Sequence, residues 1–282
     1  MGPLCGIEDR EVVLEAAARC DAHGLDTVST GGTLAFAMEC VERGLLPEGP
    51  RFGDGASLLD GIDAIVGREG LGDLLAEGSR IAAGRIGGAA PAFAPHVKGL
   101  ELPGYEPRAL HTMALGFAVG TRGADHNRSG AYELDFSDEV DRLHGDAHSA
   151  RRALEPEDRA ALFDSLILCK FLRGIFDDVY TESAGLLSAV TGEAFRADEL
   201  RALARRVVDL RKAFNVREGW VPSDDTLPDR FLEEPLATGP VAGARLTRER
   251  LREMVRSYNE ARGWSPDGYP SVAATKELLL DV

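Results

Sequence analysis

Apolar residues recur along most of this chain at the three- and four-residue spacing of helix faces, and they rarely alternate as they do in strands. In residues 9–21, for example, Val12, Val13, Ala16 and Cys20 follow this spacing behind Asp9, a suitable N-cap. The predicted helices cover residues 9–21, 30–43, 57–66, 71–83, 109–119, 156–180, 200–214 and 248–262. We therefore expect an all-α fold.

Two stretches interrupt or modify this pattern. Residues 84–107 are rich in Gly, Ala and Pro, which do not belong in a helix interior. Residues 109–119 are almost wholly apolar, which predicts a buried helix. We place a domain boundary near Pro95, giving two helical domains, 1–95 and 96–282.

Composition narrows the class of protein. Hydrophobic residues make up 44% and charged residues 28% of the 282 positions, as in soluble globular proteins. The net charge of -15 argues against nucleic acid or an anionic membrane as a partner. No apolar run approaches the roughly 20 residues that cross a bilayer, and the N-terminus lacks the pattern of a signal peptide. We expect a cytoplasmic protein.

The four cysteines, Cys5, Cys20, Cys40 and Cys169, are too few and too scattered for a disulfide scaffold, and no pair has C-x2-C spacing. Reduced thiols are the expected state.

A short polar motif closes the first predicted helix, where Asp21, Gly24, Leu25 and Asp26 fall within six residues. A carboxylate there can accept paired hydrogen bonds from a flat amino-amide heterocycle, and glycine lets the backbone approach it closely. The same residues also suit an ordinary helix end, with Gly24 as the stop and Asp26 as a cap. The hexapeptide alone leaves both interpretations open.

Residues 164–169 repeat part of this motif, with Asp164 and Leu168 in place, Ile167 where the first copy has glycine and Cys169 where it has Asp26. Taken alone, this segment is equally well a helix with a buried cysteine, because free cysteine is among the most buried residue types.

The third polar segment, residues 120–128, follows the apolar helix and holds His126 among charged neighbours. Histidine can move a proton near neutral pH or donate a hydrogen bond to a developing oxyanion. Its alternative is a loop histidine held by Asp125.

Together these segments give the chain a resemblance to the C-terminal two domains of the aldehyde ferredoxin oxidoreductase family, the tungsten or molybdenum bispyranopterin enzymes. The resemblance runs almost end to end. It covers the three motifs within residues 24–31, 123–128 and 164–171, and it also covers residues 5–9, 35–40, 214–219 and 224–231.

The resemblance implies that the two helical domains form a cofactor cleft at their interface, and it implies a role for each motif. Asp21, Gly24, Leu25 and Asp26 would bind one pterin; Asp164 and Leu168 would bind the other, and Arg128 is also expected to contact the cofactor. Cys169 matches the last of four thiolates on a [4Fe-4S] cluster. His126 matches a histidine beside the metal, where it would hydrogen-bond the substrate carbonyl oxygen or pass a proton.

The chain also departs from the family. A β-rich N-terminal domain and the first three cluster cysteines, spaced C-x2-C-x3-C, precede this region in the family, and Cys5, Cys20 and Cys40 do not replace that triad. We therefore expect both cofactors to need a partner, a separately encoded N-terminal portion.

The expected function is the C-terminal part of an enzyme that oxidises a small aldehyde to a carboxylic acid and passes electrons to ferredoxin. The alternative is a helical module without catalysis, acting as a small-ligand-binding or scaffold protein.

Overall fold

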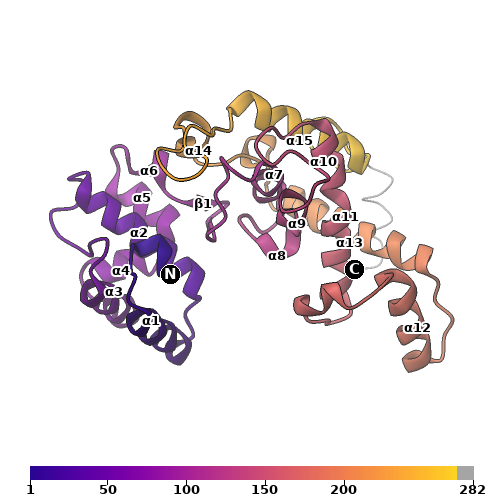
Figure 1. Cartoon of the computed structure of the whole chain (residues 1–282), viewed down its shortest axis with the longest axis horizontal. Coiled ribbons are helices and arrows are strands. Elements are labelled where there is room, and N and C mark those ends of the chain that lie inside the picture. Colours follow the sequence, from indigo (N-terminus) through magenta and orange to yellow (C-terminus); the bar gives the residue numbers. More distant parts are fainter. Residues whose placement is uncertain (272–282) are drawn as a thin grey trace. The chain divides into compact units, whose positions relative to one another are not determined.

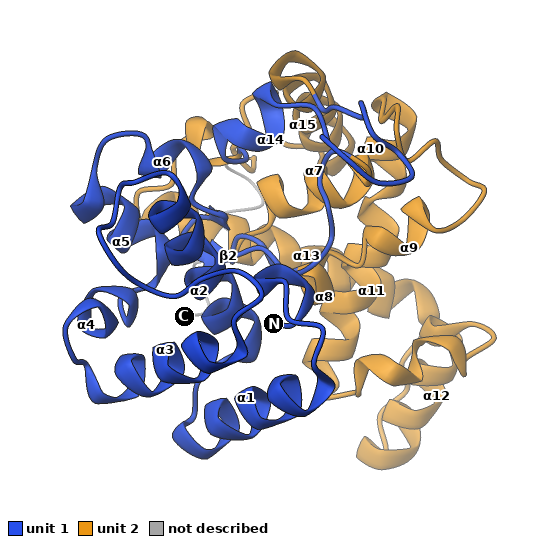
Figure 2. Ribbon diagram, turned by 60° about the vertical axis from the view of Figure 1, so that its left-hand side comes forward, with its two compact units in different colours: residues 1–108, 122–125, 226–246 blue, residues 109–121, 126–225, 247–282 orange. Residues whose placement is uncertain are grey.

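The computed structural model describes residues 1–271, and it is largely helical, with two strands of two residues each in that part of the chain (Figure 1). The prediction of an all-α fold is confirmed. The chain forms two compact units (Figure 2). Unit 1 contains residues 1–108, 122–125 and 226–246, and unit 2 contains residues 109–121, 126–225 and the described residues from 247 onward. A division at residue 95, with a cofactor cleft between the two domains, stays a prediction.

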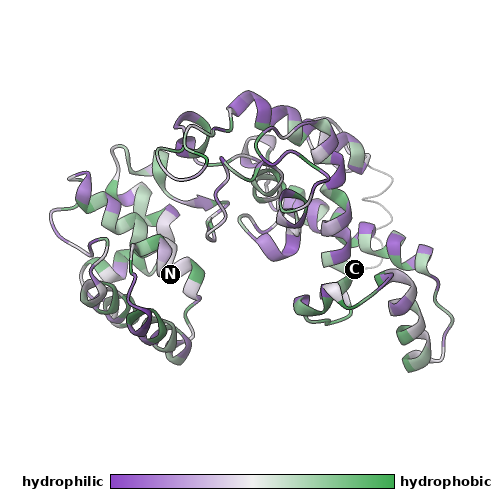
Figure 3. Ribbon diagram, viewed as in Figure 1, coloured by the Kyte–Doolittle hydropathy of each residue, from purple (hydrophilic) through white to green (hydrophobic). Residues whose placement is uncertain are grey.

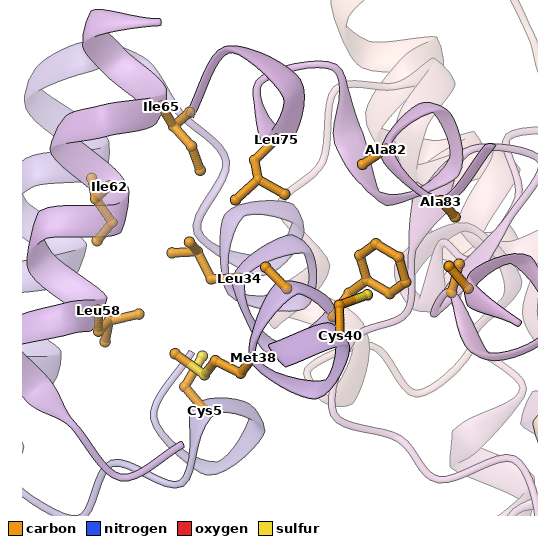
Figure 4. Packing of buried hydrophobic residues seen from close by; sticks show 14 of the residues in the cluster. Cys5, Leu34, Met38, Cys40, Leu58, Ile62, Ile65, Leu75, Ala82 and Ala83 are labelled. Carbon is orange, nitrogen blue, oxygen red and sulfur yellow. The ribbon is translucent and has the colours of Figure 1, made fainter. Parts of the chain in front are cut away.

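Unit 1 consists of short helices around one apolar core. Its elements are the 3₁₀ helix η1 (Pro3–Cys5), α1 (Arg10–His23), α2 (Thr27–Glu42), α3 (Gly55–Gly67), α4 (Leu71–Leu75), α5 (Gly78–Ile86), α6 (Ala90–Phe93), β1 (His96–Val97), β2 (Leu100–Glu101) and α14 (Asp229–Glu233). Leu34 and Met38 of α2 face Leu58 and Ile62 of α3 in this core (Figure 4).

A buried carboxylate joins three elements of unit 1. Glu101, on β2, is 4% exposed. It accepts hydrogen bonds from the Ser79 amide and hydroxyl, each at 2.8 Å, and from the Thr33 hydroxyl at 3.3 Å. These donors provide the partners that a buried carboxylate requires, so β2 is fixed against α5 and α2.

Unit 2 combines short helices with the 21-residue helix α13. Its elements are α7 (His111–Val119), α8 (His126–Ser129), α9 (Tyr132–Asp135), α10 (Ala147–Arg152), α11 (Leu154–Ser165), the 3₁₀ helices η2 (Lys170–Gly174) and η3 (Pro222–Asp224), α12 (Val179–Thr191), α13 (Ala197–Arg217) and α15 (Arg248–Arg262). All nine residues of α7 are buried, which confirms the prediction from its apolar sequence. α11 packs against α13, and α15 packs against α7 and α10.

Several helix ends follow from local chemistry. The Asp9 carboxylate accepts from the Glu11 amide and begins α1 as predicted. Asp26 caps α2 and Asp54 caps α3, each by accepting from the backbone amide of a serine three residues later, Ser29 and Ser57.

Two predicted helices are wrong in extent. The helix expected over residues 71–83 is two helices, because Gly78, with φ of +82°, starts a new one. The helix expected to run from Pro156 to about Tyr180 ends at Ser165, and η2 and the start of α12 occupy the remainder. Periodicity alone could not place that end, because an isoleucine instead of a glycine terminates the helix.

Within the described residues, no helix combines the length and apolar character that crossing a lipid bilayer would require.

Candidate functional site

The first motif forms the turn between α1 and α2. Gly24 has φ of +70°, its amide donates to the Asp21 carbonyl at 3.3 Å, and the Leu25 amide donates to the Cys20 carbonyl at 2.8 Å. These two bonds define a Schellman helix end. Asp26 then caps α2 by accepting from the Ser29 amide at 2.7 Å. Both functions of an ordinary helix end are therefore present, and the Asp21 side chain is left exposed at the turn.

The second motif folds into the same turn after α11. The Ile167 amide donates to the Asp164 carbonyl at 3.3 Å, and the Leu168 amide donates to the Phe163 carbonyl at 2.8 Å. Ile167 has φ of +57° and is 93% exposed. A β-branched residue rarely adopts this conformation, because its Cβ crowds the backbone. The backbone of the first motif is thus kept without its glycine.

Two cations hold the Asp164 carboxylate. Lys170 Nζ lies 2.9 Å from one of its oxygens and Arg211 Nη2 lies 3.2 Å from the other. Lys170 Nζ also donates to the Ala160 carbonyl at 2.8 Å. The Asp164 side chain retains 30% exposure, so its orientation is fixed while it stays accessible.

The loop before His126 depends on a glycine. Gly123 has φ of +96°, and a Cβ built there would lie 2.1 Å from the Val97 carbonyl oxygen of β1. Arg122 Nη1 pairs with the Asp125 carboxylate at 2.9 Å. No side chain larger than hydrogen fits at position 123, so the loop is pressed onto β1 within unit 1.

His126 begins α8 in unit 2, where it is partly buried. α8 packs closely on α7: a Cβ added to Gly116 would lie 2.0 Å from the Ser129 hydroxyl oxygen. Arg128, on the same helical turn, is half-buried.

A chain of contacts leads from His126 to the second motif. The His126 ring lies 6.1 Å from the Tyr132 ring, and the Arg173 guanidinium lies 5.5 Å from the Tyr132 ring centre and donates to its hydroxyl. Arg173 Nε donates to the Lys170 carbonyl at 2.8 Å, and Lys170 pairs with Asp164. Unit 2 therefore connects His126, Asp164 and the neighbouring Leu168 and Cys169.

Sequence reasoning missed Tyr132, Glu133, Lys170 and Arg173. Glu133 accepts from Arg159 and, at 2.9 Å, from Arg173. The only available signal was position: Lys170 follows Cys169 directly, and Tyr132 follows His126 by six residues. Arg173 meets Tyr132 and Glu133 across 41 and 40 residues, a separation that helical periodicity does not reveal.

The predicted site residues thus fall into two groups, each within its own unit. Asp21, Gly24, Leu25 and Asp26 belong to unit 1; the residues from His126 to Cys169 belong to unit 2.

The four cysteines differ in solvent exposure. Cys169 is exposed, whereas Cys5, Cys20 and Cys40 are buried in the core of unit 1. Burial raises the pKa of the Cys5 and Cys40 thiols to about 11 and also raises the pKa of Cys20. Within residues 1–271, no group of three or more His, Cys, Asp or Glu side chains is arranged to hold a metal ion.

These side chains fit the two expected cofactors unequally. The exposed Asp21 and partly exposed Asp164 carboxylates are acceptors suited to the N–H groups of a pterin, so these side chains fit that cofactor. A [4Fe-4S] cluster needs four thiolates, and the described residues offer one accessible thiol. The chain alone does not fit the cluster.

A cavity of about 450 Å³ lies elsewhere in unit 1. Glu39 and Arg230 form an ion pair in the wall of this cavity, with Arg230 Nη1 2.7 Å from Glu39 Oε2. Phe36 and Phe93 form part of its apolar lining. Burial alone would raise the pKa of Glu39, but Arg230 and Arg43 bring this pKa below its usual value. None of the predicted site residues lines this cavity.

Comparison with known proteins relates the whole chain to one family. The family model described as aldehyde ferredoxin oxidoreductase, domains 2 and 3, matches residues 1–280. A tungsten-containing aldehyde ferredoxin oxidoreductase of Pyrococcus furiosus is 38% identical over 95% of this chain and 45% of its own length. A protein of the same name from Pyrococcus horikoshii is 36% identical over 100% of this chain and 47% of its own length.

Among solved structures, the active-site complex BamBC of benzoyl coenzyme A reductase, determined with 1,5-dienoyl-CoA, has a similar fold. Its TM-score is 0.73 at 22% identity, and the match covers 96% of this chain and 46% of that one. The chain spans about half the length of the relatives it matches.

Proposed function

The chain belongs to the aldehyde ferredoxin oxidoreductase family, and from this premise we propose that it forms the C-terminal part of an enzyme that oxidises aldehydes to carboxylic acids. The N-terminal portion that the relatives carry would complete it. The reaction converts an aldehyde and water into a carboxylic acid, two protons and two electrons, with ferredoxin as the acceptor. We expect this to take place in the cytoplasm.

The observation that carries this proposal is the connected arrangement in unit 2. His126, a residue able to move protons, is linked through Tyr132, Arg173 and Lys170 to the carboxylate of Asp164. A module that only bound other proteins would not need a histidine, an oriented carboxylate and an exposed thiol in one connected segment. This argues against the scaffold alternative.

The pterin-bound tungsten or molybdenum would supply the two-electron redox centre and the Lewis acid. The chain's own residues would do the rest. Asp21, Gly24, Leu25 and Asp26 would hold one pterin, Asp164 and Leu168 would hold the other, the carboxylates accepting from pterin N–H groups, and Arg128 would contact the cofactor. A ring nitrogen of His126 donates a hydrogen bond to the substrate carbonyl oxygen, or moves a proton there.

Cys169 would be one of the four cluster thiolates, and the N-terminal portion would contribute the other three. No electron-transfer step follows from this chain by itself, because a single thiol does not hold the cluster.

The test is to co-express the chain with the N-terminal portion of the P. furiosus relative and to measure tungsten, pterin, iron and viologen-linked aldehyde oxidation. We expect a metal-containing complex in which His126→Ala lowers kcat by about 10²-fold or more, as loss of a general acid or base does, with unchanged tungsten content. His148→Ala, at an exposed histidine of α10, is the matched control. A stable complex without tungsten and pterin would favour the scaffold alternative.

A further inference from the structure

One segment of unit 2 places its apolar side chains outward and its charged side chains inward. Ile167, Phe171 and Ile175 are 93%, 90% and 69% exposed, and the segment is coloured mainly as hydrophobic in Figure 3. Lys170 and Arg173, which lie between them in sequence, are only 21% and 25% exposed. A surface that faces water permanently has the opposite arrangement. We call Ile167, Phe171 and Ile175 the apolar patch.

The outward orientation of the patch is fixed by the inward cations. Lys170 donates to the Ala160 carbonyl at 2.8 Å and pairs with Asp164 at 2.9 Å. Arg173 pairs with Glu133 at 2.9 Å. These interactions fasten η2 to α11 and α9, so the exposure of the patch results from a defined arrangement of the backbone. The left-handed backbone of Ile167 supports the same conclusion, because such a conformation persists only where its surroundings enforce it.

The chemistry of the patch suits a protein surface. A pterin carries hydrogen-bonding edges, and two isoleucines and a phenylalanine offer no side-chain partner for them. Large apolar side chains that a fixed backbone holds exposed within one short segment are typical of protein–protein contacts.

We propose that the apolar patch is the docking surface for the N-terminal portion that the aldehyde ferredoxin oxidoreductase relatives carry. This chain spans only 45% to 47% of those relatives, so more than half of each relative lies outside the matched region and can provide the covering surface. The inference rests on the proposed function, because that function requires the N-terminal portion.

Docking at this place has a chemical consequence. Cys169 lies between Ile167 and Phe171 in sequence and is exposed. A partner seated on the patch removes water from around its sulfur, and solvent exposure is one of the properties that set the behaviour of a thiolate-ligated centre.

The experiment uses the full chain, co-expressed with an affinity-tagged N-terminal portion of the P. furiosus relative, and measures how much chain the tag retains. We expect the double variant Phe171→Asp and Ile175→Asp to lower retention by about tenfold or more, because buried apolar anchors dominate such interfaces. Val190→Asp is the matched control, since Val190 is 84% exposed on α12 and outside the patch. Circular dichroism of each chain alone should show unchanged folding.

Retention of the double variant at the wild-type level overturns the inference, as does no retention of the wild-type chain. It is also overturned if the wild-type chain alone dimerises and the double variant does not, because the patch then binds a second copy. Tungsten and pterin analysis of the same complexes keeps the two proposals apart. If the complex depends on the patch but contains neither tungsten nor pterin, the docking proposal stands and the proposed function is contradicted. If the complex contains the metal but forms equally well with the double variant, the proposed function stands and the docking proposal is contradicted.

Discussion

The turn after α1 and the turn after α11 close their helices with the same two backbone hydrogen bonds, at the same distances. At the fourth position the first turn has Gly24 and the second has Ile167, both with positive φ. At the sixth position Asp26 caps the next helix, whereas Cys169 precedes η2 and makes no capping bond. One backbone shape thus presents two different side-chain sets.

The difference also extends to the first position of each turn. The Asp21 side chain is exposed and has no hydrogen bond or ion pair with another described residue, whereas Lys170 and Arg211 hold the Asp164 side chain. The first turn is a helix end without backbone strain, and its carboxylate is accessible. The second keeps its shape against the preference of its own residue and depends on surrounding contacts, as expected where a geometry is retained for function.

The largest expected contrast concerns thiol reactivity. With a thiol reagent such as DTNB at pH 7.5, Cys169 should react about 10²-fold faster than Cys5, Cys20 and Cys40, because the thiolate is the reactive form and burial raises the pKa of the core thiols. We expect one fast equivalent of thiol, absent in Cys169→Ser. Two fast equivalents in the folded chain would contradict the buried positions of the other three.

The same pKa shifts determine how the stability of the chain changes with pH. The folded chain keeps the Cys5 and Cys40 protons up to about pH 11, whereas in the unfolded chain these thiols ionise near 9. The unfolded state therefore loses protons first as the pH rises, and the contribution of these thiols to stability declines between about 9 and 11.

The next contrast concerns the two first-position carboxylates. Asp164→Ala should lower the free energy of unfolding by about 1–2 kcal/mol, because it leaves two partly buried cations without their shared acceptor. Asp21→Ala should change it by less than about 0.5 kcal/mol, as is usual for an exposed residue without partners. Urea unfolding followed by circular dichroism measures both. Equal losses for the two variants would show that the ion pairs of Asp164 do not stabilise unit 2.

Some of this architecture could be predicted from the sequence. The Asp9 cap, the buried helix from His111 to Val119 and the last helix from Arg248 to Arg262 follow from local patterns of apolar and capping residues. Their features are encoded within a few helical turns, where spacing is informative.

Other features lie outside the reach of such patterns. Ile167 occupies a position where glycine is the usual signal, so the end of α11 was missed. Lys170 and Arg173 resemble solvated charges in sequence, yet their partners Asp164 and Glu133 turn them inward. The assignment of His126 and of the two aspartates to one cofactor stays a prediction, derived from the family resemblance rather than from spacing.

The last contrast comes from exchanging the fourth residues of the two turns. A Cβ at Gly24 would meet no atom within 4 Å, so Gly24→Ile tests the backbone conformation alone and should cost about 1–2 kcal/mol. Ile167→Gly should relieve a similar strain but increase the entropy of the unfolded chain, leaving a net gain below about 1 kcal/mol. Ile167→Val keeps the branched side chain and serves as the control. Because Ile167 is 93% exposed, a loss of stability in Ile167→Gly would mean that the strain relieved is smaller than the entropy gained by the unfolded chain, and the strain attributed to the second turn would be wrong.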